Sequence, residues 1–392
     1  MANRREVLQA AAAIGAVAAT GAHAQTGGAV RPFRIAIPES DLVDLQNRLA
    51  RTRWPQAVPG SGWDYGADVG YIRRLSDHWR TNYDWRAAET RLNAFSQGLT
   101  EIDGVDIHFW HVRGTGRNPI PLLMLHGWPG SNFEFLELLG PLSDPAGHGA
   151  PDAPSFDLIV PAHPGFGFSG KPKEKGWGFS RIAAAFDRLM TERLGYRSYG
   201  VQGGDIGFFV GGRMAQLFPE RVRAFHTNLP YVIPPGQRPD TPASELGYRQ
   251  IQATKPDSLT VAQADSPAGL AAWIVEKFRA WSDCDGEVER AIPRDVLLTN
   301  LMFYWLTNSA PSAARLYYDS ANEPPSPAPP SKVPTAVAAF PKEPFKTPRA
   351  WVETRLNVVR WTDMPRGGHF AALEQPALLM DDVRAFFADY RA

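Results

Sequence analysis

A single aspartate stands where many hydrolases carry their nucleophile. Asp205 lies in the run GGDIG (203–207), after the apolar residues 199–202 and before an apolar stretch that begins near Phe208. This order predicts a strand, a sharp turn and a helix, which is the nucleophile elbow G-x-S-x-G with aspartate in place of serine. A carboxylate there displaces a leaving group at saturated carbon and becomes an alkyl ester, whereas serine adds to a carbonyl. The simpler alternative is an aspartate that only caps the helix.

A histidine near the C-terminus is the candidate base for this nucleophile. His369 follows two glycines in RGGHF (366–370), and the order nucleophile, acid, histidine is that of the elbow-containing hydrolases. The orienting acid should follow the strand before the histidine, and Glu343 fits that position. Asp363 lies on the strand that leads to His369, and Glu374 comes after it, so both fit less well. Taken singly, each of these residues could be an ordinary loop residue.

The segment LHGWPG (125–130) ends a predicted buried strand with a glycine-containing turn. Such a turn can aim a backbone N–H at the site as half of an oxyanion hole. The expected donors are the amides of Trp128 and of Ile206, the residue directly after the elbow aspartate. Read alone, the segment is only a turn at the end of a strand.

Composition excludes several classes of function. The 392 residues include 41 basic and 41 acidic ones, so the formal net charge is zero and nothing suggests a nucleic-acid partner. The lone cysteine, Cys284, can form neither an intramolecular disulfide nor a cysteine zinc site, and we assign it no role.

The first residues are typical of a bacterial twin-arginine signal. Arg4 and Arg5 precede an alanine-rich run over 10–19, and Ala22-His23-Ala24 offers a small-x-small cleavage site. We expect residues 1–24 to be a signal peptide and the protein to be exported, periplasmic or secreted. The alternative is an alanine-rich tail without structure. The run is too short for a stable membrane span.

The pattern after the leader predicts an α/β protein. Buried strands alternate with helical patterns, which favours a mostly parallel sheet flanked by helices. The expected strands are 33–37, 122–125, 158–161, 199–202, 222–227, 334–340 and 356–361, with a hairpin near 99–109. The expected helices are 41–51, 69–83, 85–95, 180–194, 268–281, 293–306 and 376–390. We therefore predict a helical N-terminal extension (32–98), a core in two parts (99–229 and 332–392) and a helical lid (230–331) between them.

Over residues 31–392 the sequence resembles the microsomal-type epoxide hydrolases, which have their own N-terminal domain. The resemblance rests on FRIAIP, LARTRWP, YDWRAAE, TEIDGVDIHFWHV, LHGWPG, PAHPGFGFSG, GGDIG, QATKPDSL, DSPAGLAAWIVEKF, KVPTAVAAFPKE and MPRGGHFAALEQP. It implies an α/β-hydrolase fold with a helical cap and an N-terminal segment that wraps the core. It also places the family's catalytic triad on Asp205, Glu343 and His369.

The resemblance further implies two proton-donating lid tyrosines, Tyr248 and Tyr317, with Tyr318 adjacent to the second. Without it, the default role of a lid tyrosine is packing. The sequence departs from the family at Ile206, where a tryptophan is usual, so an aromatic wall beside the nucleophile is missing and the shape of the pocket is open. The predicted export signal is a second departure, because vertebrate relatives carry a membrane anchor there.

The implied reaction converts an apolar epoxide and water to a vicinal diol through an ester on Asp205, with neither a metal nor a cofactor. A haloalkane dehalogenase would use the same ester, but it needs halide-binding N–H donors such as a tryptophan at the position of Ile206. A catalytically silent binding protein on this fold is a further alternative. A serine esterase is disfavoured because the sequence has no G-x-S-x-G elbow.

Overall fold

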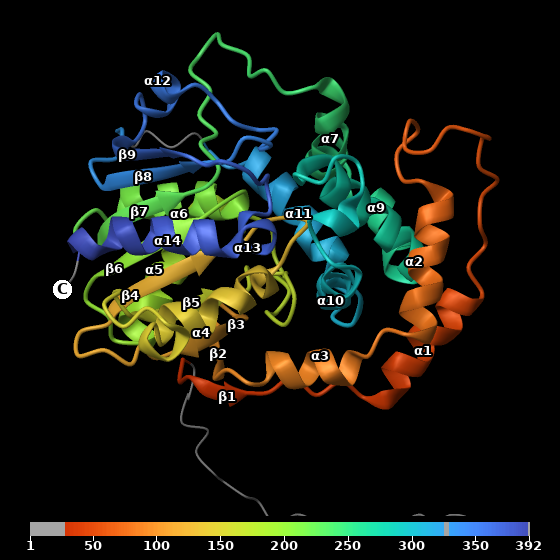
Figure 1. Cartoon of the computed structure of the whole chain (residues 1–392), viewed down its shortest axis with the longest axis horizontal. Helices are drawn as coiled ribbons and strands as arrows, with labels where there is room; N and C mark the ends of the chain where they lie inside the picture. The colour runs from red at the N-terminus through yellow and green to blue at the C-terminus, as the bar shows by residue number, and fades with distance from the viewer. Residues whose placement is uncertain (1–27, 325–328, 391–392) are drawn as a thin grey trace, which may run out of the picture.

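The computed structural model describes residues 28–324 and 329–390, and in these residues nine strands form one sheet (Figure 1). The predicted leader, 1–24, lies outside the described residues. The strands are β1 (Arg31–Phe33), β2 (Gln97–Ile102), β3 (Val105–Val112), β4 (Ile120–Leu125), β5 (Phe156–Pro161), β6 (Tyr199–Gly203), β7 (Val222–Thr227), β8 (Pro334–Ala339) and β9 (Asn357–Asp363). Their order across the sheet is β1-β2-β3-β5-β4-β6-β7-β8-β9.

The sheet is antiparallel at one edge and parallel elsewhere. The pairs from β1 to β5 are antiparallel, and those from β5 through β4 to β9 are parallel. The central strands are apolar because helices cover both of their faces, and every residue of β5 and β6 is buried. The carboxyl ends of the parallel strands share one edge, which is where open α/β sheets form their sites. The predicted α/β class is therefore confirmed.

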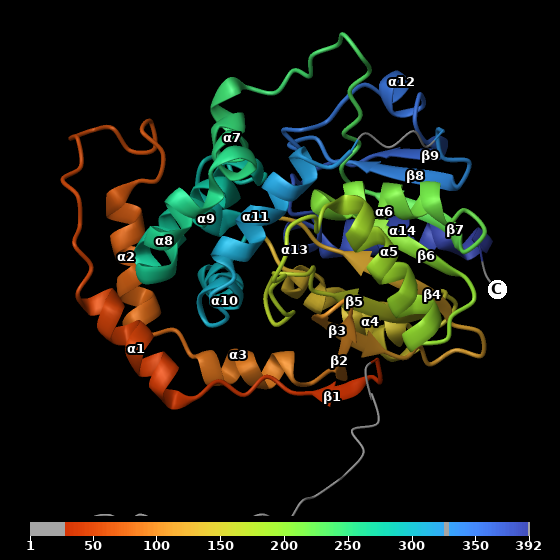
Figure 2. The same ribbon diagram turned by 180° about the vertical axis from the view of Figure 1, so that it is seen from behind.

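Helices flank the sheet, cover its carboxyl edge and extend from its N-terminal end. They are α1 (Glu39–Ala50), α2 (Val69–Thr81), α3 (Trp85–Leu92), α4 (Leu136–Ser143), α5 (Phe179–Arg188), α6 (Ile206–Leu217), α7 (Gly247–Thr254), α8 (Pro256–Asp265), α9 (Pro267–Trp281), α10 (Arg294–Trp305), α11 (Ala310–Ala321), α12 (Arg349–Val352), α13 (Ala371–Glu374) and α14 (Pro376–Phe387). Helices α4 and α14 lie on one face of the sheet, and α5 and α6 lie on the other (Figures 1 and 2).

The chain between β7 and β8 forms a helical cap beside the sheet, made of α7 to α11 (Figure 1). The sequence predicted α9 and α10 to within two residues at each end, but it missed α7, α8 and α11. These three helices mix small, polar and apolar residues, and Pro256 and Pro311 lie at the first turns of α8 and α11, where proline is tolerated. Because their apolar periodicity is weak, the sequence pattern did not predict these helices.

The N-terminal segment wraps around the molecule from the sheet to the cap (Figure 2). Strand β1 pairs with β2, whereas α1 and α2 pack against α9 of the cap. The predicted strand over 33–37 is wrong beyond Phe33. There the backbone N–H groups of Ile35 and Ile37 donate to the side chains of Asn93 (3.0 Å) and Glu89 (2.8 Å) instead of to another strand.

Candidate active site

Asp205 occupies a strained turn between β6 and α6. Its φ of 49° is unusual for a residue with a Cβ. The flanking glycines make the turn possible, because a Cβ on Gly203 would lie 2.5 Å from the Gly207 carbonyl oxygen, and one on Gly207 would lie 2.1 Å from that of Leu125. The elbow motif therefore needs both glycines for close backbone packing.

The Asp205 carboxylate is held by backbone amides. Its Oδ1 accepts the N–H of Trp128 at 2.8 Å, and the N–H of Ile206 also hydrogen-bonds to this carboxylate. Gly127 lets the loop approach so closely, because a Cβ there would lie 2.3 Å from the Asp205 side chain. The two residues that the sequence predicted as oxyanion donors thus bind one carboxylate together.

His369 lies between two carboxylates. Its Nδ1 is 2.8 Å from Oε2 of Glu343, and its Nε2 is 3.7 Å from Oδ2 of Asp205. Because a carboxylate only accepts, Nδ1 carries a proton and donates a hydrogen bond to Glu343. The other oxygen of Glu343 accepts the N–H of Phe345 at 2.9 Å, which fixes the acid. Glu343 follows β8 and His369 follows β9, so strand order brings them to the same edge as Asp205.

The two other candidate acids have different partners. Oδ1 of Asp363 accepts the indole N–H of Trp361 at 3.1 Å. Glu374 is buried and accepts the backbone N–H groups of Asp283, Gly368 and Phe370 at 2.7 to 2.9 Å. Glu374 therefore anchors the loop that presents the histidine, and burial raises its pKa to about 7.

Charge and burial act in opposite directions on the pKa values in this cluster. Burial lowers the pKa of His369, but the charges of Glu343 and Asp205 outweigh it and raise the pKa to about 9. Burial raises the pKa of Asp205, although His369 and the two amides oppose that shift. The histidine and Asp205 thus stabilise each other's charged forms in the resting protein.

Two cap tyrosines face this cluster. The rings of Tyr248 on α7 and Tyr317 on α11 are 5.9 Å apart, and their hydroxyl groups hydrogen-bond to each other. Tyr248 stacks on Trp128 with a centroid distance of 4.7 Å. Burial, and then for Tyr248 the Asp205 charge, raises the pKa of both phenols, so they stay protonated and able to donate.

Both domains of the chain match known family models. Residues 30–135 match the epoxide hydrolase N terminus, and residues 120–376 match the alpha/beta hydrolase fold. Epoxide hydrolase 1 of Oryctolagus cuniculus is 37% identical, over 91% of this chain and 88% of its own. The chain belongs to the epoxide hydrolase family.

Solved structures in this family share the fold over nearly the whole chain. The juvenile hormone epoxide hydrolase of the silkworm Bombyx mori superposes with a TM-score of 0.82 at 32% identity, covering 93% of this chain and 94% of its own. The epoxide hydrolase of Aspergillus niger gives a TM-score of 0.79 at 31% identity, covering 92% and 96%. The likeness therefore includes the N-terminal segment and the cap.

A cavity of about 110 Å³ lies between Asp205 and the two tyrosines. Ile206 lines it, as the sequence departure from the family suggested. Aromatic walls are nevertheless present, because other elements supply them: Phe179, Phe209, Tyr231 and Phe345. The apolar lining and the convergent polar groups give this cavity of the epoxide hydrolase the usual features of a small-molecule site.

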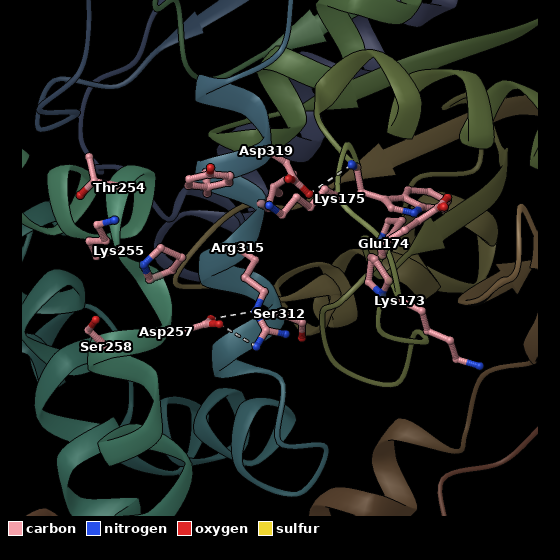
Figure 3. Close-up of a pocket in the computed structure, with 16 residues that line it drawn as sticks. Lys173, Glu174, Lys175, Thr254, Lys255, Asp257, Ser258, Ser312, Arg315 and Asp319 are labelled. Carbon is pink, nitrogen blue, oxygen red and sulfur yellow. Dashed lines mark hydrogen bonds and ion pairs between the residues drawn. The ribbon is translucent and has the colours of Figure 1, made fainter.

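A larger, outer cavity of about 420 Å³ lies along α11, where Ser312, Arg315 and Asp319 line it (Figure 3). Charged side chains line it, including Lys173, Lys175 and Arg315, and Arg315 forms an ion pair with Asp257. Tyr318 also lines this outer cavity, whereas Tyr317 lines the inner one. The geometry thus separates the two adjacent tyrosines that the sequence left difficult to distinguish.

Two residues at the site were missed by the sequence interpretation. Glu134 and Asn228 line a small second cavity beside Asp205. The signal for Glu134 was a lone carboxylate in the apolar run 133–136. Cys284 is buried, and its thiol donates to the carbonyl of Arg279.

Within residues 28–324 and 329–390, no group of three or more histidine, cysteine or acidic side chains could hold a metal ion. None of the helices in these ranges is both long and apolar enough to cross a bilayer.

Proposed function

We propose that the protein hydrolyses an apolar epoxide to a vicinal diol through an ester on Asp205. The observation that carries this proposal is the arrangement around one carboxylate, with two protonated phenols on its cap side and a histidine–glutamate pair on its core side. The names of the relatives support the same reaction class.

In the first step, Oδ2 of Asp205 attacks an epoxide carbon and the carbon–oxygen bond of the strained ring breaks. Tyr248 and Tyr317 hydrogen-bond the ring oxygen and give it a proton as the alkoxide develops. The product is an alkyl ester between Asp205 and the substrate carbon, with a new hydroxyl on the neighbouring carbon.

In the second step, His369 takes a proton from water, and the resulting hydroxide adds to Cγ of Asp205. The negative charge develops on Oδ1, which the Trp128 amide already holds, and the Ile206 amide hydrogen-bonds to the same carboxylate. The bond from Cγ to Oδ2 then breaks, His369 returns the proton to Oδ2, and the diol leaves with that oxygen. The oxygen of the water stays on Asp205.

Ester formation itself prepares the base for the second step. The charge of Asp205 helps to hold the pKa of His369 near 9 in the resting protein. Alkylation removes that charge, so the pKa of His369 falls and the imidazole becomes able to accept a proton. Glu343 keeps the ring oriented throughout.

A panel of aryl, alkyl and terpene epoxides, run beside haloalkanes on the wild type and on Asp205→Ala, tests the proposal. The wild type is expected to form diols, and Asp205→Ala is expected to form none while keeping the wild-type fold by circular dichroism. Diol formation by folded Asp205→Ala would falsify the role of Asp205. Halide release without diol formation would favour the dehalogenase alternative.

We also propose that the protein is exported, on the strength of the twin-arginine pattern over 1–24. Replacement of Arg4 and Arg5 by lysine is expected to keep the full-length chain in the cytoplasm of a bacterial host. Export of this variant at the wild-type level would contradict the proposal.

A further inference from the structure

Asp205 lies between two cavities of different character. The apolar cavity of about 110 Å³ faces the cap, and a second cavity of about 20 Å³ lies on the core side. Among the described residues, Asp205 is the only one that lines both. Since a cavity needs roughly 10 to 15 Å³ of such volume to hold one water molecule, the smaller one is large enough for that.

The smaller cavity is lined by groups that suit a reacting water. His369, Trp128, Asn228 and a carboxylic acid, Glu134, share it with Asp205. Asn228 is itself tied to the histidine loop, since its Nδ2 donates to the His369 carbonyl at 3.5 Å. The cavity therefore brings the base, the carbon to be attacked and a further carboxyl group to one place.

Glu134 reaches this cavity because Gly130 has no side chain. A Cβ on Gly130 would lie 1.4 Å from Oε1 of Glu134, so the carboxyl group fills the space beside that glycine. The backbone N–H of Ser131 hydrogen-bonds to the carboxyl group, which is the glutamate half of a capping box for the short helix Asn132–Phe135. This capping bond uses one oxygen and leaves the other for the cavity.

The pKa of Glu134 depends on the charge of Asp205, which changes during the reaction. Burial, reinforced by the nearby charge of Asp205, raises the pKa of Glu134 to about 8, and His369 opposes that shift. In the resting protein the group is therefore neutral near pH 7, and its carbonyl oxygen is its main acceptor. When the ester forms, the charge on Asp205 disappears and the Glu134 carboxyl becomes easier to ionise, which makes both of its oxygens acceptors.

We propose that Glu134 is a positioning residue that holds the hydrolytic water in the small cavity. One hydrogen of the water points to Nε2 of His369 and the other to the free oxygen of Glu134. A lone pair of the water then faces Cγ of the Asp205 ester. This inference rests on the proposed two-step function and adds a residue to its second step only.

The test measures the two steps separately. Wild type, Glu134→Ala and Glu134→Gln are mixed with styrene oxide, and the mass of the intact protein is followed by quenched flow. Asp84→Ala is the matched control, because Asp84 caps α3 by accepting the Ala87 N–H at 3.0 Å and lines neither cavity. It removes a capping carboxylate without touching the small cavity.

Glu134→Ala is expected to form the ester at the wild-type rate and to hydrolyse it about 10 to 100 times more slowly, as for a misplaced reactant. Accordingly kcat and KM fall together, kcat/KM stays constant, and the ester becomes the main steady-state form. Glu134→Gln, whose single acceptor oxygen must serve either Ser131 or the water, is expected to slow hydrolysis less. Asp84→Ala is expected to change neither rate.

Hydrolysis by Glu134→Ala at the wild-type rate would overturn the inference, and so would an equal slowing of both steps, which indicates a capping role only. If Glu134→Ala fails to fold, the test uses Glu134→Gln instead. A wild-type ratio of ester hydrolysis to ester formation in Glu134→Gln would then overturn the inference. A wild type that forms neither ester nor diol contradicts the proposed function instead.

Discussion

At the scale of single residues, the site depends on which groups hold protons. Both cap phenols stay protonated because burial raises their pKa. His369 is a charged imidazolium as long as Asp205 is a carboxylate, because that charge raises its pKa. The resting protein is thus ready for ring opening, which needs an anionic nucleophile and a proton donor. The loss of the Asp205 charge on alkylation then makes the base available for the second step.

The two phenols are expected to share the donor role. Tyr248→Phe combined with Tyr317→Phe should slow ester formation by about 10²- to 10⁴-fold, the usual worth of general acid catalysis. Each single change should cost less, because the other phenol still donates. Tyr318→Phe is the matched control, since Tyr318 lines the outer cavity, and it should leave the rate unchanged. A double variant with wild-type ester formation would place the acid elsewhere.

The residue types in the elbow, the late histidine and the strand-end turn were enough to predict which residues meet. The structure brings Asp205, Glu343 and His369 together with the Trp128 and Ile206 amides. Glu134 could not be predicted in the same way. Its importance comes from the missing side chain of Gly130, and such packing is visible only in three dimensions.

At the scale of elements, the elbow is a contact between two backbones. Gly207 on α6 lies so close to the end of β4 that a methyl group would meet the Leu125 carbonyl at 2.1 Å. That strand end leads into the loop that supplies the Trp128 amide. The geometry of the oxyanion donors is therefore tied to the first turn of α6.

Gly207→Ala is expected to destabilise the protein by about 1 to 3 kcal/mol, as overpacking does, and to slow both steps by moving the elbow. Gly212→Ala in the same helix is the control, because its methyl would meet Phe225 only at 3.9 Å. That change should stabilise the helix by about 0.5 to 1 kcal/mol. Urea unfolding measures the change in the free energy of unfolding for each variant. Equal changes for Gly207→Ala and Gly212→Ala would contradict this account.

Elements with strong apolar periodicity were predicted from the sequence, and those without it were not. Strand β7 and helix α9 carry continuous or periodic apolar residues, and their predicted ends lie within one residue of the observed ones. Helices α7 and α8 are short and polar, and they owe their stability to packing against α11. Tertiary contacts of this kind are outside the reach of local sequence patterns.

At the scale of the whole molecule, the N-terminal segment connects the sheet to the cap. Its contacts with the cap include the hydroxyl groups of Tyr71 to Glu289 and of Tyr83 to Thr299, both at 2.9 Å. Trp79 is buried, and its indole N–H donates to the sulfur of Met302 on α10 at 3.3 Å. Since the cap carries both tyrosines, this segment helps to fix their distance from Asp205.

Trp79→Ala is expected to cost about 3 to 5 kcal/mol in the free energy of unfolding, because it leaves a cavity under the cap. It should also speed amide hydrogen exchange in α9 and α10 more than in β6. Tyr65→Ala is the control, because Tyr65 is 84% exposed and its loss should change stability by at most about 0.5 kcal/mol. Unchanged exchange in the cap of Trp79→Ala would show that the segment does not restrain it.

The most direct test of the central claim is a single turnover in water enriched in oxygen-18. With the protein in excess over styrene oxide, the ester route delivers an oxygen of Asp205 to the diol and leaves the heavy oxygen on the aspartate. We predict an unlabelled diol and a peptide containing Asp205 that is heavier by one oxygen-18. A labelled diol with an unlabelled Asp205 peptide would mean that water attacks the epoxide directly, and it would contradict the account.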